Sequence, residues 1–118
     1  VRDHKKLRAF ELADQLALTT YRATAKFPKE EMFGLTSQLR RAAVSAPSNI
    51  VEGCSRSSQV DYLRFQEIAF GSTCEAEYQI TLAERLEFPS GVDYREWIDQ
   101  ASETARVLSG LIRSLRNT

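Results

Sequence analysis

Short polar and charged side chains recur at helical spacing in residues 38–52, QLRRAAVSAPSNIVE, and they are the residues best suited to chemistry in this chain. Intervals of three and four residues place side chains on one face of a helix, so a guanidinium, hydroxyls, amides and a carboxylate would line one seam. The members are Gln38, Arg41, Ser45, Ser48 or Asn49, and Glu52. Such a seam could serve as a hydrogen-bonded structural network or as a polar ligand site.

Glu75 adds a carboxylate to a second helical segment, on a face that otherwise holds Ile68, Leu82 and Leu86. We expect this face to be buried, and a buried carboxylate needs a cation or several donors. Arg41 and Arg40 are the cations predicted to pair with it. A structural ion pair that fixes helix register is the favoured interpretation, and a ligand site is the alternative. The expected buried polar network consists of Gln38, Arg40, Arg41, Asn49, Glu52 and Glu75.

The sequence lacks a complete set of catalytic residues. Its only histidine is His4, so neither a Glu-x-x-His di-metal motif nor a triad with a histidine base can be assembled. No glycine-rich phosphate loop is present. Glu52 and Glu75 are candidates for an acid–base pair, but no nucleophile or cofactor motif accompanies them. We therefore predict a protein that is not an enzyme and has no catalytic residues, metal site or cofactor.

Charge is balanced over the chain but unevenly distributed. Lys plus Arg and Asp plus Glu each number 16, so nothing in the net charge of zero requires nucleic-acid binding. Residues 1–29 nevertheless carry a net charge of +4, and residues 57–88 carry −4. A solvated face is one interpretation of the basic residues, and phosphate contacts are the other. The candidate nucleic-acid-binding residues are Lys5, Lys6, Arg8, Arg22, Lys26 and Arg56.

The elements that would position these side chains are four helices. Two of the three prolines and three of the five glycines lie at or near three breaks, and helical periodicity fills the segments between them. The expected helices span about residues 5–26, 31–54, 59–87 and 92–116, with Asp61 and Asp93 near helix starts. Short connections favour antiparallel neighbours. The predicted fold is all-α, a single domain over residues 1–118 that forms an antiparallel up-and-down four-helix bundle.

Pro47 lies within the second of these helices. The apolar pattern of Leu39, Ala43, Ala46 and Ile50 continues through it, so we expect one continuous helix that is bent at Pro47. Nearby serine and asparagine side chains can hydrogen-bond the disturbed backbone.

The first helix has an unusually wide apolar arc, which includes Leu7, Phe10, Leu18 and Tyr21. One bundle core needs less apolar surface from one helix. Excess surface of this kind is typical of a subunit contact, and Phe70 on the third helix adds to it. Leu18 and Phe70 are the candidate oligomer-interface residues.

The remaining sequence features indicate a cytoplasmic protein that does not bind membranes. No apolar run approaches the roughly 18 residues of a membrane span, and no signal-peptide pattern opens the chain. Cys54 and Cys74 form no CxxC motif and are expected to be reduced, buried thiols.

Two long motifs connect these features with a known family. Residues 27–53, FPKEEMFGLTSQLRRAAVSAPSNIVEG, closely resemble the signature of the four-helix-bundle proteins first noticed in intervening sequences of bacterial large-subunit ribosomal RNA genes. Residues 64–80, RFQEIAFGSTCEAEYQI, are similar to the family's second signature. The matching positions are Pro28, Glu31, Gly34, Leu35, Gln38, Arg40, Arg41, Pro47, Asn49, Ile50, Glu52, Gly53, Gly71, Ser72 and Glu75.

The resemblance also implies an assembly and partners. The family includes the accessory variability proteins of diversity-generating retroelements, which are homopentamers that bind nucleic acid and a reverse transcriptase through a basic surface. Those proteins are strongly basic, whereas this chain is neutral. We therefore expect a non-catalytic oligomeric binding module, a pentamer, whose partner is structured RNA, an RNA–DNA hybrid or a reverse-transcriptase-like protein. The alternative is a protein-interaction scaffold with no nucleic-acid role.

Overall fold

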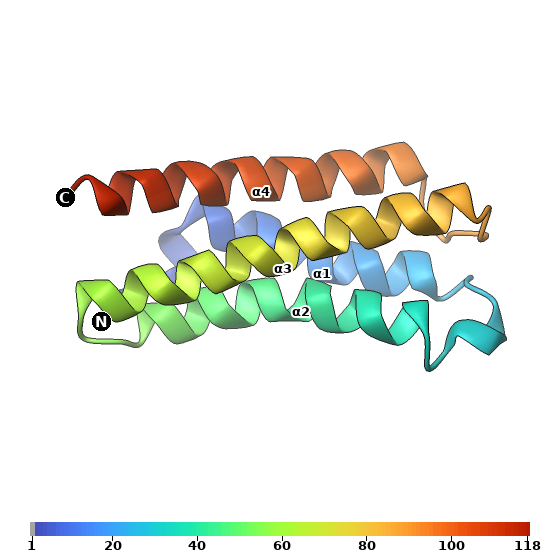
Figure 1. Cartoon of the computed structure of the whole chain (residues 1–118), viewed down its shortest axis with the longest axis horizontal. Helices are drawn as coiled ribbons and strands as arrows, with labels where there is room; N and C mark the ends of the chain where they lie inside the picture. The colour runs from blue at the N-terminus through green and yellow to red at the C-terminus, as the bar shows by residue number, and fades with distance from the viewer. Residues whose placement is uncertain (1) are drawn as a thin grey trace.

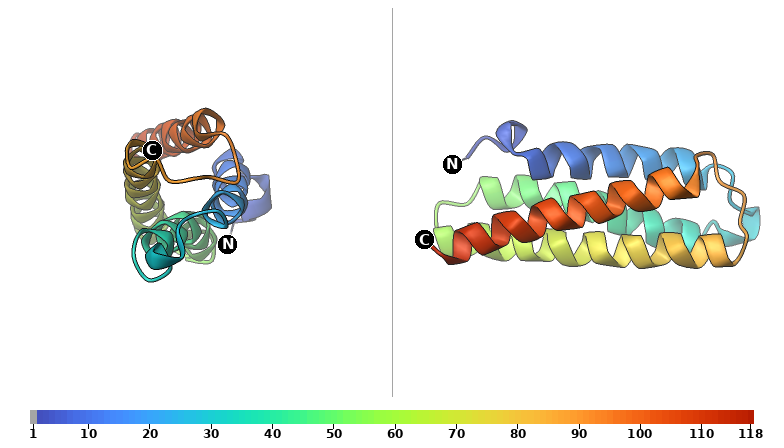
Figure 2. Two further views of the ribbon diagram at one scale, coloured as in Figure 1. Left: turned by 90° about the vertical axis from the view of Figure 1, so that its right-hand side faces the viewer. Right: turned by 90° about the horizontal axis from the view of Figure 1, so that it is seen from above.

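Four long helices make up the chain in a computed structural model, which describes residues 2–118. Successive helices run in opposite directions, and the chain reverses at the ends of an elongated bundle of 44 × 23 × 19 Å (Figure 1). Each helix packs on two neighbours: α1 on α2 and α4, and α3 on the same two (Figure 2). The predicted antiparallel four-helix bundle is confirmed. The elements are η1 (His4–Lys6), α1 (Arg8–Thr24), η2 (Lys29–Glu31), α2 (Leu35–Cys54), α3 (Gln59–Arg85) and α4 (Tyr94–Arg116).

Side-chain caps fix three of the helix starts. Ser58 Oγ accepts from the backbone N–H of Asp61 at 3.1 Å, and Asp93 Oδ1 accepts from that of Arg95 at 2.8 Å. Helix α2 begins four residues later than predicted, because a short 3₁₀ turn precedes it. Glu31 Oε1 in that turn accepts from the N–H of Leu35 at 3.0 Å, so a glutamate outside the helix caps it.

Helix α2 continues through Pro47, as predicted. Asn49 Nδ2 donates to the backbone carbonyl of Ser45 at 2.8 Å and to Ser45 Oγ at 3.0 Å, so a side chain does bond the backbone next to the proline. The expected bend at Pro47 stays a prediction.

The buried stripe of α3 is built mostly from small and polar side chains. It follows alternating steps of four and three residues, the period of a bundle seam. The expected burial of the face through Ile68, Glu75 and Leu86 is wrong: Ile68 is 44% exposed and Leu86 53% exposed, and Glu75 is exposed. Alanine and threonine suit a close helix contact better than these larger residues. The stripe consists of Tyr62, Gln66, Ala69, Thr73, Ala76, Ile80 and Ala83.

Helix α2 presents equally small residues to α3. Ala42, Ala46 and Gly53 are buried, and the α2–α3 contact is the most extensive in the bundle. A Cβ at Gly53 would lie 2.7 Å from Gln66 Nε2, so any larger residue would require a shift. The two backbones approach closely because so little side chain separates them.

The large aromatic side chains of the core lie toward the end of the bundle opposite Gly53. Trp97 on α4 is fully buried, and its ring lies 6.1 Å from that of Phe27, centroid to centroid. Its Nε1 donates to Thr20 Oγ1 at 3.1 Å. The α3–α4 connection closes over this cluster, because the N–H of Gly91 donates to the carbonyl of Ala23 at 3.0 Å.

Both cysteines are free thiols. Cys54 is buried, as expected, but the prediction that Cys74 is buried is wrong, because it lies on the exposed side of α3. None of the helices within residues 2–118 has the length and apolarity needed to cross a membrane.

Replacing Ala76 by Leu should destabilise the protein by about 1–3 kcal/mol, because the α2–α3 seam has no room for a larger side chain. The matched change on the exposed face, Ile68→Ala, should alter the free energy of unfolding by less than about 0.5 kcal/mol. Urea unfolding of both variants measures the difference. A large loss for Ile68→Ala together with a tolerated Ala76→Leu would contradict this assignment of the seam.

Candidate binding surfaces

One end of the bundle gathers positive charge. Residues 2–8, 52–67 and 113–118 meet there, around the α2–α3 connection and both chain termini (Figure 1). They carry eight basic and four acidic side chains, a net charge of +4 in a chain of net charge zero. We call this the basic end. Its basic residues are Arg2, Lys5, Lys6, Arg8, Arg56, Arg64, Arg113 and Arg116.

Aromatic rings hold several guanidinium groups of the basic end. The guanidinium carbon of Arg2 lies 3.8 Å from the centroid of the Tyr62 ring. Arg56 and Arg64 approach Phe65, at 4.9 and 5.2 Å from its centroid. Such cation–π contacts orient the planar groups while leaving their N–H donors free for other acceptors.

The residues beneath these contacts are buried. The backbone N–H of Arg2 donates to the carbonyl of Cys54 at 2.9 Å, which fixes the N-terminal segment across the end of α2. Burial raises the pKa of the Cys54 thiol and of the Tyr62 hydroxyl, and the charge of Arg2 opposes both shifts. Both groups therefore stay neutral at ordinary pH and act in packing.

Ion pairs at the basic end are exposed, and two of the three lie within a single helical turn. Arg56 pairs with Glu52 at 3.0 Å, Arg64 with Asp61 at 3.6 Å, and Arg116 with Glu67. Exposed pairs of this kind contribute at most about 1 kcal/mol each, so a phosphate can compete for the cations. Lys5, Lys6 and Arg113 have no ion-pair partner among residues 2–118.

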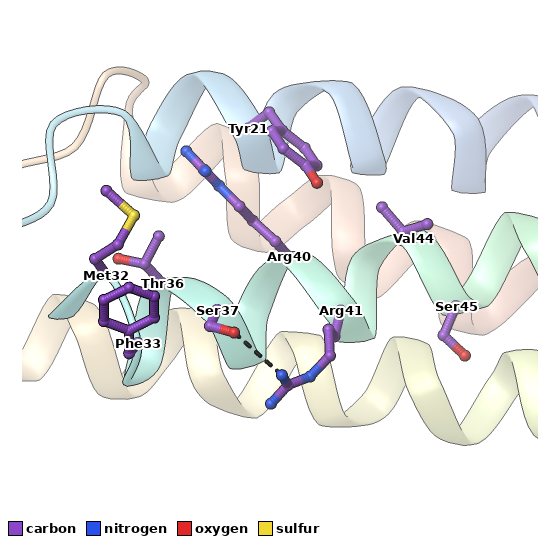
Figure 3. A pocket seen from close by; sticks show the side chains of 9 residues that line it. All are labelled: Tyr21, Met32, Phe33, Thr36, Ser37, Arg40, Arg41, Val44 and Ser45. Carbon is purple, nitrogen blue, oxygen red and sulfur yellow. Dashed lines mark hydrogen bonds between the residues drawn. The ribbon is translucent and has the colours of Figure 1, made fainter.

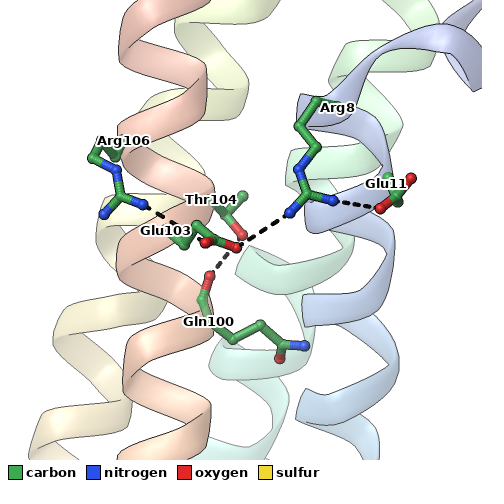
Figure 4. A network of polar contacts seen from close by, with 6 residues as sticks. All are labelled: Arg8, Glu11, Gln100, Glu103, Thr104 and Arg106. Atoms are coloured by element: carbon green, nitrogen blue, oxygen red, sulfur yellow. Dashed lines mark hydrogen bonds and ion pairs between the residues drawn. The ribbon is translucent and has the colours of Figure 1, made fainter.

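Arg8 lies at the border between the basic end and an acidic face of the bundle. It lies between Glu11 at 2.5 Å and Glu103 of α4 at 3.7 Å, and Arg106 approaches the other side of Glu103 (Figure 4). The groove between α1 and α4 beside it is also lined by Glu96 and Asp99. This face is predominantly acidic, so Arg8 is largely neutralised by its neighbours.

The candidate nucleic-acid-binding residues are divided between the two ends of the bundle. Arg22 is 14 positions after Arg8, about 21 Å along the helix axis. With Lys26 it lies at the end formed by residues 22–41 and 75–99, whose net charge is −2. Four of the six candidate residues, Lys5, Lys6, Arg8 and Arg56, therefore share one end, and Arg22 and Lys26 do not. Sequence reasoning missed Arg2, Arg64, Arg113 and Arg116, of which Arg113 and Arg116 reach the basic end only through the antiparallel chain path.

An apolar groove runs along the α1–α2 face. Two depressions, of about 660 and 380 Å³, adjoin at Tyr21 and Val44, which line both. Leu18 is 52% exposed beside it, and Phe33, just before α2, is 95% exposed (Figure 3). Arg40 covers part of the groove, since its guanidinium lies 4.5 Å from the Tyr21 ring centroid and its Nε donates to Thr24 Oγ1 at 2.9 Å.

Phe70 does not join this groove. It is half-buried on α3 and packs against the core, beside a small hollow between α3 and α4. The two candidate interface residues, Leu18 and Phe70, therefore lie on different faces of the bundle.

The expected buried polar network is wrong, because none of its six members is buried. Glu75 forms no ion pair with any residue in the range 2–118, whereas Glu52 pairs with Arg56. Arg41 Nη1 donates to Ser37 Oγ at 3.1 Å, as Figure 3 shows. Arg40 lies on the α1–α2 face, and Gln38, Arg41 and Glu75 flank the α2–α3 seam without entering it, because alanines and threonines already fill it.

Three of the six members still share a site. Gln38, Arg41 and Glu75 line a polar hollow of about 380 Å³ between α2 and α3. Across residues 2–118 no group of three or more His, Cys, Asp or Glu side chains is placed to hold a metal ion.

Comparison with known proteins gives a family and a fold. A family model described as "23S rRNA-intervening sequence protein" matches residues 5–110. A crystal structure of a protein of unknown function from the S23 ribosomal protein family of Bacteroides thetaiotaomicron VPI-5482 superposes with a TM-score of 0.78 at 21% identity. It covers 89% of this chain and 95% of that one, which supports the fold alone. No curated protein matches the chain.

Glu75→Ala should leave the melting temperature nearly unchanged, with a stability change within about 0.5 kcal/mol, because the carboxylate is exposed and unpaired. Thr20→Val is the positive control: it removes the acceptor of the buried Trp97 N–H and should cost about 1–3 kcal/mol. Thermal unfolding measures both. A loss of several kcal/mol for Glu75→Ala would contradict its exposure and support the buried ion pair that the sequence predicted.

Proposed function

Because the chain belongs to the 23S rRNA-intervening sequence protein family, we propose that it is a non-catalytic, oligomeric module that binds structured RNA through the basic end of its bundle. The observation that carries this proposal is the separation of charge in a neutral chain, with +4 at one end and an acidic remainder. A net charge of zero therefore does not prevent a local phosphate-binding surface.

The chemistry of the basic end suits RNA in two ways. Its unpaired lysines and Arg113 provide sequence-independent contacts to phosphates, and each contact releases counterions. Phe65 lies between Arg56 and Arg64, so planar cations and an aromatic ring stand together. Splayed-out bases of loops and bulges stack on such groups. An RNA–DNA hybrid presents similar phosphates, and a reverse-transcriptase-like protein that carries one is a further partner within this proposal.

The position of the only histidine supports a non-catalytic function. His4 lies in η1, and its ring packs edge-on against Phe10 at 4.7 Å between centroids. A general base needs to reach a nucleophile, and this imidazole instead serves the packing of the N-terminal segment.

The apolar α1–α2 groove supports self-association. A nearly fully exposed phenylalanine beside an apolar groove is unfavourable in water, and a second copy of the chain could cover both. Five copies, as the family resemblance implies, would repeat the basic end five times, so that weak contacts add through multivalency. The same groove favours the alternative function, a protein-interaction scaffold, if the basic end binds no RNA.

Assembly can be measured directly. We expect a homopentamer of about 67 kDa, five times the 13.4 kDa chain, in multi-angle light scattering. Leu18→Glu should dissociate it, because burying an unpaired carboxylate costs several kcal/mol. The matched control is Leu86→Glu: Leu86 is 53% exposed, like Leu18, but lies outside the groove. A wild-type monomer at micromolar concentration would contradict the proposed assembly.

RNA binding can be assigned to one end by two triple variants that each remove three positive charges. Arg56→Gln/Arg64→Gln/Arg113→Gln should weaken binding at least tenfold at about 50 mM salt and lower the salt slope by about 2–3, since each lost phosphate contact removes about 0.7–0.9. Arg22→Gln/Lys26→Gln/Lys29→Gln, at the opposite end, should change affinity less than twofold. Fluorescence anisotropy with a structured RNA over a salt series measures both.

Two results would overturn this proposal. Equal losses for both triple variants would remove the basic end as the binding surface. No retention of RNA by the wild-type protein at about 50 mM salt, where electrostatic binding is favoured, would leave the protein scaffold as the function.

A further inference from the structure

A small hollow opens between α3 and α4 beside the basic end, and we call it the α3–α4 hollow. Its volume is about 250 Å³, which is less than the roughly 300–1,000 Å³ of pockets that hold whole small molecules. It therefore suits one flat group of a larger ligand. The lining residues are Glu67, Phe70, Ser109, Ile112, Arg113 and Arg116.

The α3–α4 hollow combines an apolar side with a cationic side. Phe70 is half-buried and packs on the core, and Ile112 is only 5% exposed. Arg113 and Arg116, three residues apart on α4, bring two positive charges of the basic end to the same hollow. This pairing of surfaces fits a ligand in which a planar ring is joined to an anion. A nucleotide has that composition, whereas an aromatic side chain of a protein carries no anion beside its ring.

Glu67 supplies a carboxylate acceptor at the rim of the hollow. Arg116 Nη2 donates to Glu67 Oε2, which orients the carboxylate and leaves Oε1 outside the pair. A carboxylate has about four lone-pair positions, so it accepts further donors. Guanine presents N1–H and N2–H₂ side by side on its Watson–Crick edge, which matches the two oxygens of a carboxylate. Each of the other three bases presents one N–H group there, next to an acceptor.

We propose that the α3–α4 hollow binds one unpaired guanine nucleotide. The base lies against Phe70 and Ile112, Glu67 accepts from its N1–H and N2–H₂, and Arg113 donates to the attached phosphate. Arg113 is suited to this role because it has no ion-pair partner among residues 2–118. The base edge must be out of a helix to reach the carboxylate, so duplex RNA cannot fill the hollow.

This inference rests on the proposed RNA binding for the strand that carries the nucleotide. A free guanine nucleotide offers the same chemistry, and a separate experiment distinguishes the two sources.

The first experiment measures fluorescence anisotropy with the full chain and three RNAs at about 50 mM salt. The RNAs are a duplex, the same duplex with one bulged guanine, and the same duplex with one bulged adenine. The guanine bulge should bind about fivefold or more tightly than the duplex, because a base stacked on an aromatic side chain adds affinity. The adenine bulge should bind about threefold or more weakly than the guanine bulge, because it lacks the paired N–H donors.

Two substitutions separate base recognition from charge. Phe70→Leu keeps an apolar side chain of similar volume and should abolish the preference for the bulged RNAs while leaving duplex affinity unchanged. Glu67→Gln should abolish the preference for guanine over adenine and yet tighten duplex binding slightly, because it removes a negative charge from the basic end. A merely structural role would weaken binding to all three RNAs alike.

Tyr78→Leu is the matched control for Phe70→Leu. Tyr78 lies on the same helix, is 58% exposed and does not line the hollow, so its loss should change none of the three affinities. Circular dichroism verifies that every variant is folded.

The second experiment tests the free nucleotide. 5′-GMP, AMP and ribose 5-phosphate are each titrated to about 20 mM, well above a 1 mM Kd, into the isotope-labelled chain and followed by NMR. GMP should shift the amide signals of residues 67–70 and 109–116, and the other two should bind more weakly. A bulge preference without a GMP shift assigns the site to an RNA strand, and a GMP shift without a bulge preference assigns it to the free nucleotide.

Two results would overturn the guanine site. Equal affinity for all three RNAs, with no GMP shift, would remove the site and leave the proposed RNA binding intact. Dissociation of the oligomer by Phe70→Leu, seen in light scattering, would assign the hollow to a second copy of the chain. If no RNA binds at all, the proposed function fails, and the GMP titration alone then decides whether the guanine site stands or falls.

Discussion

The close approach of α2 to α3 is the constraint on which the rest of the bundle depends. Alanine, threonine and glycine along both helices let the backbones come together, and Gly53 leaves no space even for a Cβ beside Gln66. Larger apolar side chains therefore concentrate elsewhere, around Trp97 and Phe27. Long polar side chains next to the seam are displaced to its edges, where Gln38, Arg41 and Glu75 line the polar hollow.

The antiparallel path of the chain turns a neutral sequence into an electrically asymmetric molecule. Consecutive basic residues near the N-terminus are divided between opposite ends, because α1 spans the length of the bundle. Arg56, Arg64 and Arg113 come from distant parts of the sequence and meet where α2, α3 and α4 begin or end. Charge averaged along the sequence therefore says little about a surface, whereas charge grouped by the end of the bundle describes it directly.

Sequence patterns were sufficient for the fold and insufficient for the polar site. Helix number and order follow from periodicity and from the position of proline and glycine, and Asp93 signals the start of α4. The start of α2 could not be placed from the sequence, because its cap, Glu31, lies outside the helix. The Glu31 side chain reaches forward past Gly34 to the backbone N–H of Leu35. Glu75 was misplaced because Ile68, Leu82 and Leu86 have the higher hydropathy, whereas close packing selects Ala69, Thr73 and Ala76 for burial.

The apolar groove and the polar hollow are neighbours on α2, where Arg41 and Ser45 line both, and the basic end lies at one end of the bundle. The groove follows the side formed by α1 and α2, and the polar hollow lies between α2 and α3. Copies that associate side by side through the groove would leave the ends of their bundles free. Five basic ends would then lie at one rim, where each phosphate contact raises the local concentration of RNA for the next. In the proposed assembly, a neutral chain with a small basic surface would gain what a strongly basic monomer obtains from its net charge alone, because affinity depends on the number of simultaneous phosphate contacts.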